Sequence, residues 1–220
     1  KAVCNPTAEM AIALMLAVNR RVAELDKALR TGRNGEKSAK LWHVMDYLGN
    51  TLEDKTLGII GLGNIGKRVA KIGTALGMKV IYHNRQSMVQ EYRSVELYEL
   101  LQISDVVSLH CPLTPETQHL IAKKELELMK NTAVLINTAR GAVVDEKALV
   151  EALQTGQIRA AGLDVFEEEP FIPEELYEMD NVVLLPHKGS GTVECRVNTS
   201  VETVENIVAF YEGNPKNIVN

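Results

Sequence analysis

The chain has 220 residues, and its 45% apolar and 24% charged content is ordinary for a soluble globular protein. The net charge is -5 and the basic residues are dispersed, which excludes an electrostatic footprint for nucleic acid or an anionic membrane. Three cysteines, Cys4, Cys111 and Cys195, lie far apart without CxxC spacing. This pattern argues against a disulfide framework or a zinc site and favours a reducing, cytoplasmic location.

The N-terminal part predicts a helix over residues 6–30, opened by Pro6 and Thr7 and closed before a polar, glycine-containing loop. The apolar stretch at residues 10–18 is too short to span a bilayer and continues into a charged, helix-periodic segment. We expect an exposed helix or one that packs against another subunit. The flanks of the stretch do not resemble a signal peptide. The chain begins with Lys1 instead of methionine, which suggests a processed, cut or partial product.

Residues 56–187 alternate between short apolar runs and amphipathic segments. The runs are nearly continuous, as expected of strands that are covered on both faces, and the segments between them repeat apolar residues at helical spacing. This alternation predicts an α/β fold with a doubly wound parallel sheet. A long helix from about 192 to 212 is expected after it. The apolar runs are residues 56–61, 79–83, 105–110, 133–138, 160–165 and 181–185.

A glycine-rich turn, GLGNIG, follows the first apolar run directly and opens a helical segment. In this strand–turn–helix context a GxGxxG pattern is specific for dinucleotide binding, whereas alone it is a weak match. Gly61 permits the tight turn, Gly63 lets a pyrophosphate approach the backbone, and Gly66 lets the helix pack closely on the strand. The helix N-terminus would face the phosphates with unpaired N–H groups and a partial positive charge.

The residues after the second apolar run bear on which dinucleotide is bound. In an NAD site, an Asp or Glu about 20 residues beyond the glycine turn accepts hydrogen bonds from the ribose and would repel a 2′-phosphate. Here Asn84 is neutral, and Arg85 supplies a cation whose fork geometry suits phosphate. We therefore expect NADP(H), with NAD possible. The alternative interpretation is a solvated surface arginine beside an asparagine in a turn.

Three further stretches, at residues 137–146, 162–170 and 184–192, each place a polar group just beyond the end of a predicted strand. Open α/β sheets bind their ligands at that edge. Together with the glycine turn and HCPLTPET at 110–117, these stretches resemble the D-2-hydroxyacid dehydrogenase family across nearly the whole chain. Residues 166–196 look most like the glyoxylate/hydroxypyruvate reductase branch, including plant hydroxyphenylpyruvate reductases, whose members typically prefer NADPH.

The resemblance implies roles for particular residues. Arg140 would bind the substrate, Glu169 would be the acidic partner, and His187 would be the acid/base. Asp164 and Thr138 match positions that line the nicotinamide side. The other residues expected beside the cofactor are Leu62, Gly63, Asn64 and Ile65 in the pyrophosphate turn, with Cys111 and Gly189.

The chemistry of 2-keto acid reduction requires the same residue types. A group that titrates near neutrality must protonate the carbonyl oxygen as hydride reaches the carbon, and His187 fits. A carboxylate bonded to the other ring nitrogen, such as Glu169, favours imidazolium and fixes the ring, whereas Lys188 would disfavour imidazolium. Arg140 can bind the substrate carboxylate and stabilise the developing alkoxide. Taken singly, each is an ordinary surface residue, but their occurrence at successive strand ends favours a site.

The resemblance also implies an organisation. Residues 1–191 would form the cofactor domain, and the helix and tail at 192–220 would return to a substrate domain outside the chain. Related enzymes pair through the first helix, so a homodimer is expected, with a small 2-keto or 2-hydroxy acid as substrate and no metal. Two other interpretations stay open: a dinucleotide-responsive binding protein like the corepressors of the family, and an NAD-linked phosphoglycerate-type dehydrogenase.

Overall fold

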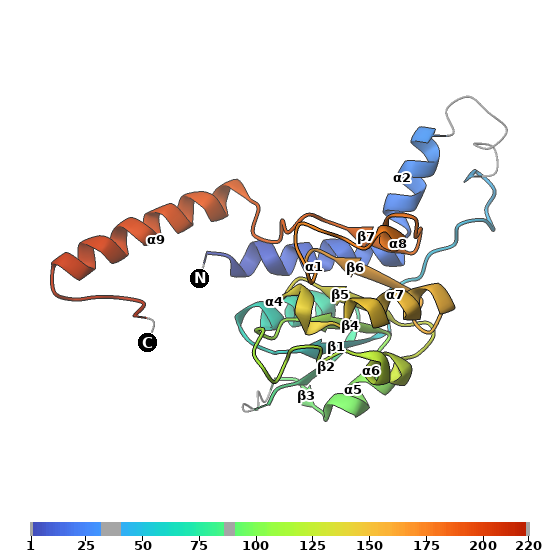
Figure 1. The fold of residues 1–220 in the computed structure, drawn as a ribbon, viewed down its shortest axis with the longest axis horizontal. Coiled ribbons are helices and arrows are strands. Elements are labelled where there is room, and N and C mark those ends of the chain that lie inside the picture. Colours follow the sequence, from blue (N-terminus) through green and yellow to red (C-terminus); the bar gives the residue numbers. More distant parts are fainter. Residues whose placement is uncertain (1, 32–40, 86–90, 219–220) are drawn as a thin grey trace.

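A single parallel sheet forms the centre of the molecule, and helices cover both of its faces (Figure 1). The computed structural model describes residues 2–31, 41–85 and 91–218. Within these residues the strand order is β3-β2-β1-β4-β5-β6-β7, and every neighbouring pair is parallel. The predicted doubly wound α/β fold is therefore confirmed.

The strands coincide with the predicted apolar runs, except for one short edge strand. β3 has only two residues, both exposed, so no apolar run marks it in the sequence. β4, β5 and β6 are buried along their whole length, as strands covered on both faces must be. The strands are β1 (Thr56–Ile60), β2 (Lys79–His83), β3 (Arg93–Ser94), β4 (Val106–Leu109), β5 (Val134–Asn137), β6 (Ala160–Leu163) and β7 (Val182–Leu184).

The chain reverses its direction of travel across the sheet between β1 and β4. β2 and β3 extend the sheet on one side of β1, whereas β4 to β7 extend it on the other. Such a reversal leaves a crevice outside the carboxyl ends of the two central strands, where open α/β sheets bind ligands. The residues that follow β1 and β4 are Gly61 and His110, and both line a cavity there.

The sheet divides the core into two apolar clusters, one on each of its faces. One cluster lies under α5, α6 and α7, and the other lies under α1 and α4. A four-residue helix, α8, and a 3-10 turn, η1, were not indicated by the sequence pattern, because segments of three or four residues are too short to show a helical repeat. The helices are α1 (Cys4–Asn19), α2 (Val22–Thr31), α4 (Asn64–Ala75), α5 (Leu97–Ile103), α6 (Lys123–Leu128), η1 (Gly141–Val143), α7 (Glu146–Thr155), α8 (Glu174–Tyr177) and α9 (Val193–Tyr211).

The prediction of one helix over residues 6–30 is wrong, because the structure has α1 and α2 instead. The backbone turns at Arg21, whose φ of 53° lies in the left-handed region, and its guanidinium pairs with Glu24 at 2.5 Å. The expectation of an exposed helix is also wrong for α1, which packs against α4 and the sheet with residues such as Leu14 and Met15 fully buried. Packing of this helix against another subunit stays a prediction. α2 has no buried residue and projects from the domain (Figure 1).

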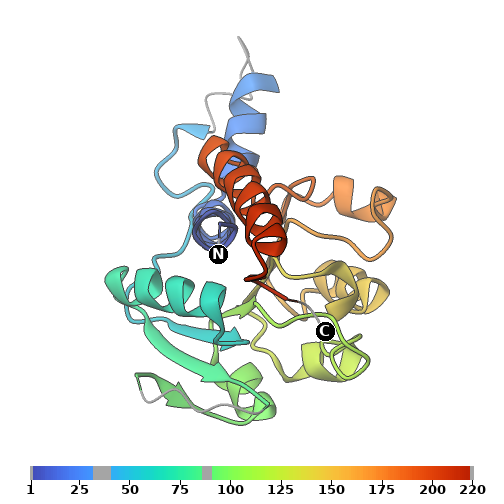
Figure 2. The same cartoon turned by 90° about the vertical axis from the view of Figure 1, so that its left-hand side faces the viewer.

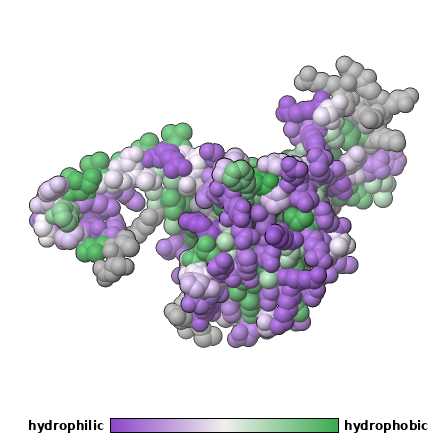
Figure 3. Space-filling model, viewed as in Figure 1, coloured by the Kyte–Doolittle hydropathy of each residue, from purple (hydrophilic) through white to green (hydrophobic). Residues whose placement is uncertain are grey.

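The predicted C-terminal helix is confirmed as α9. Its N-cap is Thr192, whose hydroxyl accepts a hydrogen bond from the Cys195 N–H at 3.1 Å. The helix extends away from the sheet in Figure 1 and lies in front of the domain in Figure 2, which is viewed from that side, and apolar residues appear along it (Figure 3). Among the described helices, none is both long and apolar enough to cross a membrane. The exposed apolar residues of α9 are Val193, Val197, Val201, Val204, Ile207, Val208, Phe210 and Tyr211.

Candidate active site

The glycine turn joins β1 to α4 with the geometry that the sequence predicts. Gly61 has a φ of 97°, and a Cβ on Gly66 would lie 2.3 Å from the carbonyl oxygen of Gly61. A Cβ on Gly63 would meet nothing within 4 Å. Because α4 begins without a side-chain cap, the N–H groups of its first turn are available to a ligand, as phosphate binding requires.

Two adjoining cavities run along the carboxyl ends of the strands. The first, of 280 Å³, is lined by the glycine turn and by Asn84 and Arg85, and the second, of 520 Å³, is lined by Arg140 and His187. Both include residues 110–112, so together they form one elongated cleft across the switch point. An elongated cleft suits a dinucleotide, with the glycine turn toward one end and Arg140 and His187 toward the other.

The imidazole of His187 and the carboxylate of Glu169 form a direct pair, with 2.7 Å between Nδ1 and Oε2. The Phe166 N–H donates to the other oxygen of Glu169 at 3.1 Å, so both carboxylate oxygens are held. Partial burial opposes ionisation of Glu169, but these hydrogen bonds and the nearby charges of His187 and Arg140 outweigh it and lower the carboxyl pKa. Glu169 is therefore anionic at neutral pH and orients the ring of His187.

Asp164 anchors the turn that carries His187. Its two carboxylate oxygens accept hydrogen bonds from the N–H groups of Lys188, at 2.7 Å, and Gly189, at 2.6 Å. The His187 N–H also donates to the Asp164 carbonyl at 2.8 Å. Burial raises the pKa of Asp164, while the two N–H bonds act in the opposite direction. Asp164 and Gly189 both line the larger cavity, where the resemblance places them beside the cofactor.

Arg140 is positioned by a loop that the sequence did not show to be structured. The Asn137 side chain closes this loop: its amide donates to the Arg140 carbonyl at 3.0 Å, and its oxygen accepts from the Ala139 N–H at 3.0 Å. The Arg140 guanidinium donates to the Ala139 carbonyl at 2.6 Å and lines the same cavity as His187. The fold thus brings Arg140, Glu169 and His187 together from the loops after β5, β6 and β7: Arg140 and His187 line one cavity, and Glu169 pairs with His187.

Two buried polar atoms in the cleft have no hydrogen-bond partner within the described part of the chain: His110 Nδ1 and Thr138 Oγ1. Leu109 pairs with Asn137 in the sheet, so the next residues, His110 and Thr138, lie side by side at the ends of β4 and β5. Buried polar atoms without partners are rare in folded proteins, and these two line the cavity that would take the nicotinamide half of a dinucleotide. The donor set therefore fits a polar ligand at this point of the cleft.

The imidazole of His110 is neutral at physiological pH. Its ring is enclosed, although the residue as a whole is partly exposed, and burial lowers its pKa to about 4. The other ring nitrogen, Nε2, shares a hydrogen bond of 2.8 Å with the Ser108 hydroxyl. Sequence reasoning passed over this interaction, because a His two residues from a Ser on a strand carries no recognisable signal.

The depressed pKa of His110 predicts a specific pH dependence of stability. Below the ordinary histidine pKa, near 6.5, the unfolded chain binds a proton that the folded chain excludes, so stability falls as the pH drops toward about 4. Urea unfolding at pH 7 and pH 4.5 should show about 2 kcal/mol more acid destabilisation in the wild type than in His110→Asn. Equal losses in the two proteins would mean that His110 titrates normally.

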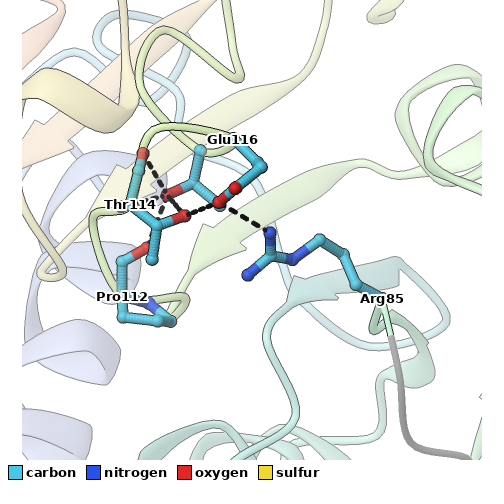
Figure 4. A network of polar contacts seen from close by, with 5 residues as sticks. Arg85, Pro112, Thr114 and Glu116 are labelled. Atoms are coloured by element: carbon cyan, nitrogen blue, oxygen red, sulfur yellow. Dashed lines mark hydrogen bonds and ion pairs between the residues drawn. The ribbon is translucent and has the colours of Figure 1, made fainter.

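At the other end of the cleft, Asn84 and Arg85 make different contacts. The Asn84 side-chain oxygen accepts the Leu62 N–H at 2.7 Å and so ties the glycine turn to the end of β2. Arg85 lines the smaller cavity and pairs with Glu116 at 3.2 Å (Figure 4). Cys111 lines both cavities, and burial raises the pKa of its thiol, which opposes a nucleophilic role.

Comparison with known proteins identifies the family to which this architecture belongs. The family model described as "D-isomer specific 2-hydroxyacid dehydrogenase, NAD binding domain" matches residues 12–189. The chain belongs to the D-2-hydroxyacid dehydrogenase family. The resemblance noted in the sequence is confirmed, and so is the expectation that this D-2-hydroxyacid dehydrogenase chain carries the nicotinamide dinucleotide-binding domain.

Individual relatives of this D-2-hydroxyacid dehydrogenase chain are glyoxylate reductases. The glyoxylate reductase of Thermococcus litoralis is 50% identical over 224 residues, covering 98% of this chain and 67% of the relative. That of Aeropyrum pernix is 51% identical over 228 residues, covering 97% of this chain and 66% of the relative. The chain thus spans about two thirds of the length of these curated relatives.

Solved structures agree with this placement. A glyoxylate reductase from Paecilomyes thermophila superimposes with a TM-score of 0.88 at 40% identity, covering 98% of this chain and 65% of the other. An NADPH-dependent glyoxylate/hydroxypyruvate reductase from Sinorhizobium meliloti, solved with NADP and malonate, gives 0.88 at 34% identity, covering 96% of this chain and 65% of the other. The glycine turn and the charged residues of this chain therefore lie on the fold that such reductases use.

Proposed function

We propose that the protein containing this chain reduces a small 2-keto acid to the D-2-hydroxy acid with NADPH, with glyoxylate or hydroxypyruvate as the first candidates and hydroxyphenylpyruvate as another. The observation that carries the proposal is that His187, which is paired with Glu169, lines the same cavity as Arg140 on the carboxyl edge of the sheet. The names of the relatives, glyoxylate reductase above all, support the substrate class.

The residues of the cleft are suited to hold the cofactor. The first turn of α4 and the open space over Gly63 would receive the pyrophosphate, and Arg85 would face a 2′-phosphate. His110 and Thr138 would offer their unpartnered atoms to the nicotinamide half. When bound, the dinucleotide supplies the hydride.

The chain's own residues handle the substrate charge and the proton. Arg140 would bind the substrate carboxylate or the keto oxygen and stabilise negative charge as it develops on that oxygen. His187 would donate a proton from Nε2 of its imidazolium to the oxygen and become neutral, and Nδ1 would stay bonded to Glu169 throughout. Because Glu169 remains anionic, it stabilises the imidazolium before transfer and preserves the ring orientation after it.

The assay follows NADPH oxidation with glyoxylate, hydroxypyruvate and hydroxyphenylpyruvate, using the longest form of the protein that its gene encodes. Turnover with at least one of these acids that depends on Arg140 and His187 supports the proposal. Nucleotide-dependent assembly without turnover would favour a dinucleotide-responsive binding protein instead. Turnover that shows no preference for NADPH over NADH would favour an NAD-linked dehydrogenase.

The cofactor preference depends on Arg85. Replacing Arg85 by Ala should weaken NADP⁺ binding about 10-fold and leave NAD⁺ binding within about twofold, because only the 2′-phosphate needs the guanidinium. Titration calorimetry with both nucleotides measures this difference. Arg93→Ala is the matched control, since Arg93 is an exposed arginine paired with Glu99 that lines neither part of the cleft. Equal NADP⁺ and NAD⁺ affinities in the unaltered chain would refute the preference.

A further inference from the structure

Glu116 forms an ion pair with Arg85, the cation that a 2′-phosphate would need. Its Oε2 atom lies 3.2 Å from Nη1 of Arg85, and no other carboxylate pairs with Arg85 among the described residues. Arg85 lies two residues beyond the end of β2, while Glu116 belongs to the turn after β4, so the pair links the loops that follow these two strands (Figure 4). Arg85 lines the smaller cavity, whereas Glu116 is not among its lining residues.

The turn that carries Glu116 is held independently of Arg85. The Thr114 hydroxyl donates to the same Glu116 oxygen at 2.7 Å. The Thr117 side chain, which is buried, accepts the Thr114 N–H at 2.7 Å and donates to the Pro112 carbonyl at 2.7 Å. The hydrogen bond from Thr114, followed by the Glu116 N–H and Arg85, lowers the pKa of Glu116. The carboxylate is thus fixed and ionised beside the guanidinium at neutral pH.

An exposed ion pair of this kind is readily exchanged. The Arg85 and Glu116 side chains are 48% and 66% exposed, and exposed pairs contribute little net stability because water screens them. A 2′-phosphate carries about two negative charges near neutral pH and three acceptor oxygens, so it binds a guanidinium more strongly than one carboxylate does. The phosphate would have to separate Arg85 from Glu116 and would also be repelled by Glu116.

We propose that Glu116 competes with the 2′-phosphate of NADP(H) for Arg85 and thereby limits how strongly the chain discriminates NADP(H) from NAD(H). The inference rests on the proposed NADPH-linked function. NAD(H) lacks the phosphate, so it leaves the Arg85–Glu116 pair undisturbed. Glu116 is accordingly a specificity-determining residue that acts against the phosphorylated cofactor, from a loop distant in sequence from the β2 position that usually makes this choice.

The experiment measures dissociation constants of NADP⁺ and NAD⁺ by titration calorimetry for the 220-residue chain and three variants: Glu116→Gln, Arg85→Ala and the double variant. Glu116→Gln should tighten NADP⁺ binding about 3- to 10-fold at low salt and leave NAD⁺ within about twofold. In the Arg85→Ala background, Glu116→Gln should change the NADP⁺ affinity clearly less, because the guanidinium for which the carboxylate and the phosphate compete is absent. Adenosine 2′,5′-bisphosphate and 5′-AMP should repeat the pattern.

Glu99→Gln is the matched control, because it removes one carboxylate from an exposed Arg–Glu pair that does not line the cleft, and it should change neither affinity. An unchanged NADP⁺ affinity in Glu116→Gln, or equal tightening in both Arg85 backgrounds, would overturn the competition. If Arg85→Ala weakens NADP⁺ but Glu116→Gln does nothing, the competition fails while the proposed cofactor preference stands. If Arg85→Ala has no effect on NADP⁺, both fail.

Discussion

Replacing His187 by Gln is expected to lower kcat for 2-keto acid reduction by about 10²- to 10⁴-fold while NADPH binding stays within about twofold. Glutamine can donate a hydrogen bond, but it cannot release a proton to the substrate oxygen. His187 is exposed and its side chain contacts Glu169 at the mouth of the cavity, so the substitution leaves no buried void. Steady-state kinetics and nucleotide titration on the same preparation separate the two effects.

Glu169→Gln provides the comparison for His187. Glutamine can still accept a hydrogen bond from Nδ1 through its side-chain oxygen, but it no longer stabilises an imidazolium by charge, so kcat should fall less than in His187→Gln. For the reduction, the alkaline limb of the pH–rate profile should also move to lower pH in Glu169→Gln, because the proton donor is the imidazolium that the Glu169 charge stabilises; a purely structural role would not cause this shift. Full activity in His187→Gln would remove His187 from the mechanism.

The second large effect is expected at the glycine turn, where two alanine substitutions should fail for different reasons. In Gly63→Ala the new methyl group meets nothing in the protein within 4 Å, so the free energy of unfolding should be unchanged. The methyl group would stand where the pyrophosphate must approach the backbone, and the loss of charge-assisted hydrogen bonds should weaken NADP⁺ and NAD⁺ alike by about 10- to 100-fold.

Gly66→Ala should instead destabilise the domain. Its Cβ would lie 2.3 Å from the Gly61 carbonyl oxygen, which is backbone and cannot rotate away, so α4 must shift from β1 at a cost of about 1–3 kcal/mol. Urea unfolding and nucleotide titration of the two variants distinguish these effects. A stable Gly63→Ala protein with unimpaired binding would show that the dinucleotide does not use this turn.

The parallel sheet could be predicted from the sequence because its strands are buried on both faces and lie between helices of a different periodicity. β3 and α8 could not, since neither is long enough to show a period. The division of the first helix at Arg21 could not be predicted, because the left-handed backbone conformation of a single arginine does not alter the hydrophobic pattern. Residues 10–18 of α1 are all apolar, and such a run does not distinguish burial inside a domain from burial between subunits.

The candidate site was predictable in its charged residues but not in the contacts that position them. Arg140, Glu169 and His187 follow strand ends, and a parallel sheet brings its strand ends to one edge. Asn137 holds the Arg140 loop through two hydrogen bonds with its neighbours, and Glu116 reaches Arg85 from a different strand end. Such side-chain pairings depend on loop conformations that residue spacing alone does not specify.

In the proposed mechanism, Arg140, Glu169 and His187 surround the reactive ring of a dinucleotide that spans the switch-point cleft. A crystal structure of the protein with NADP⁺ tests it most directly. We predict density for the pyrophosphate at the N-terminus of α4 and for the nicotinamide ring in the cavity lined by Thr138, Arg140 and His187. A nucleotide bound elsewhere, or a nicotinamide ring pointing away from His187, would contradict the account.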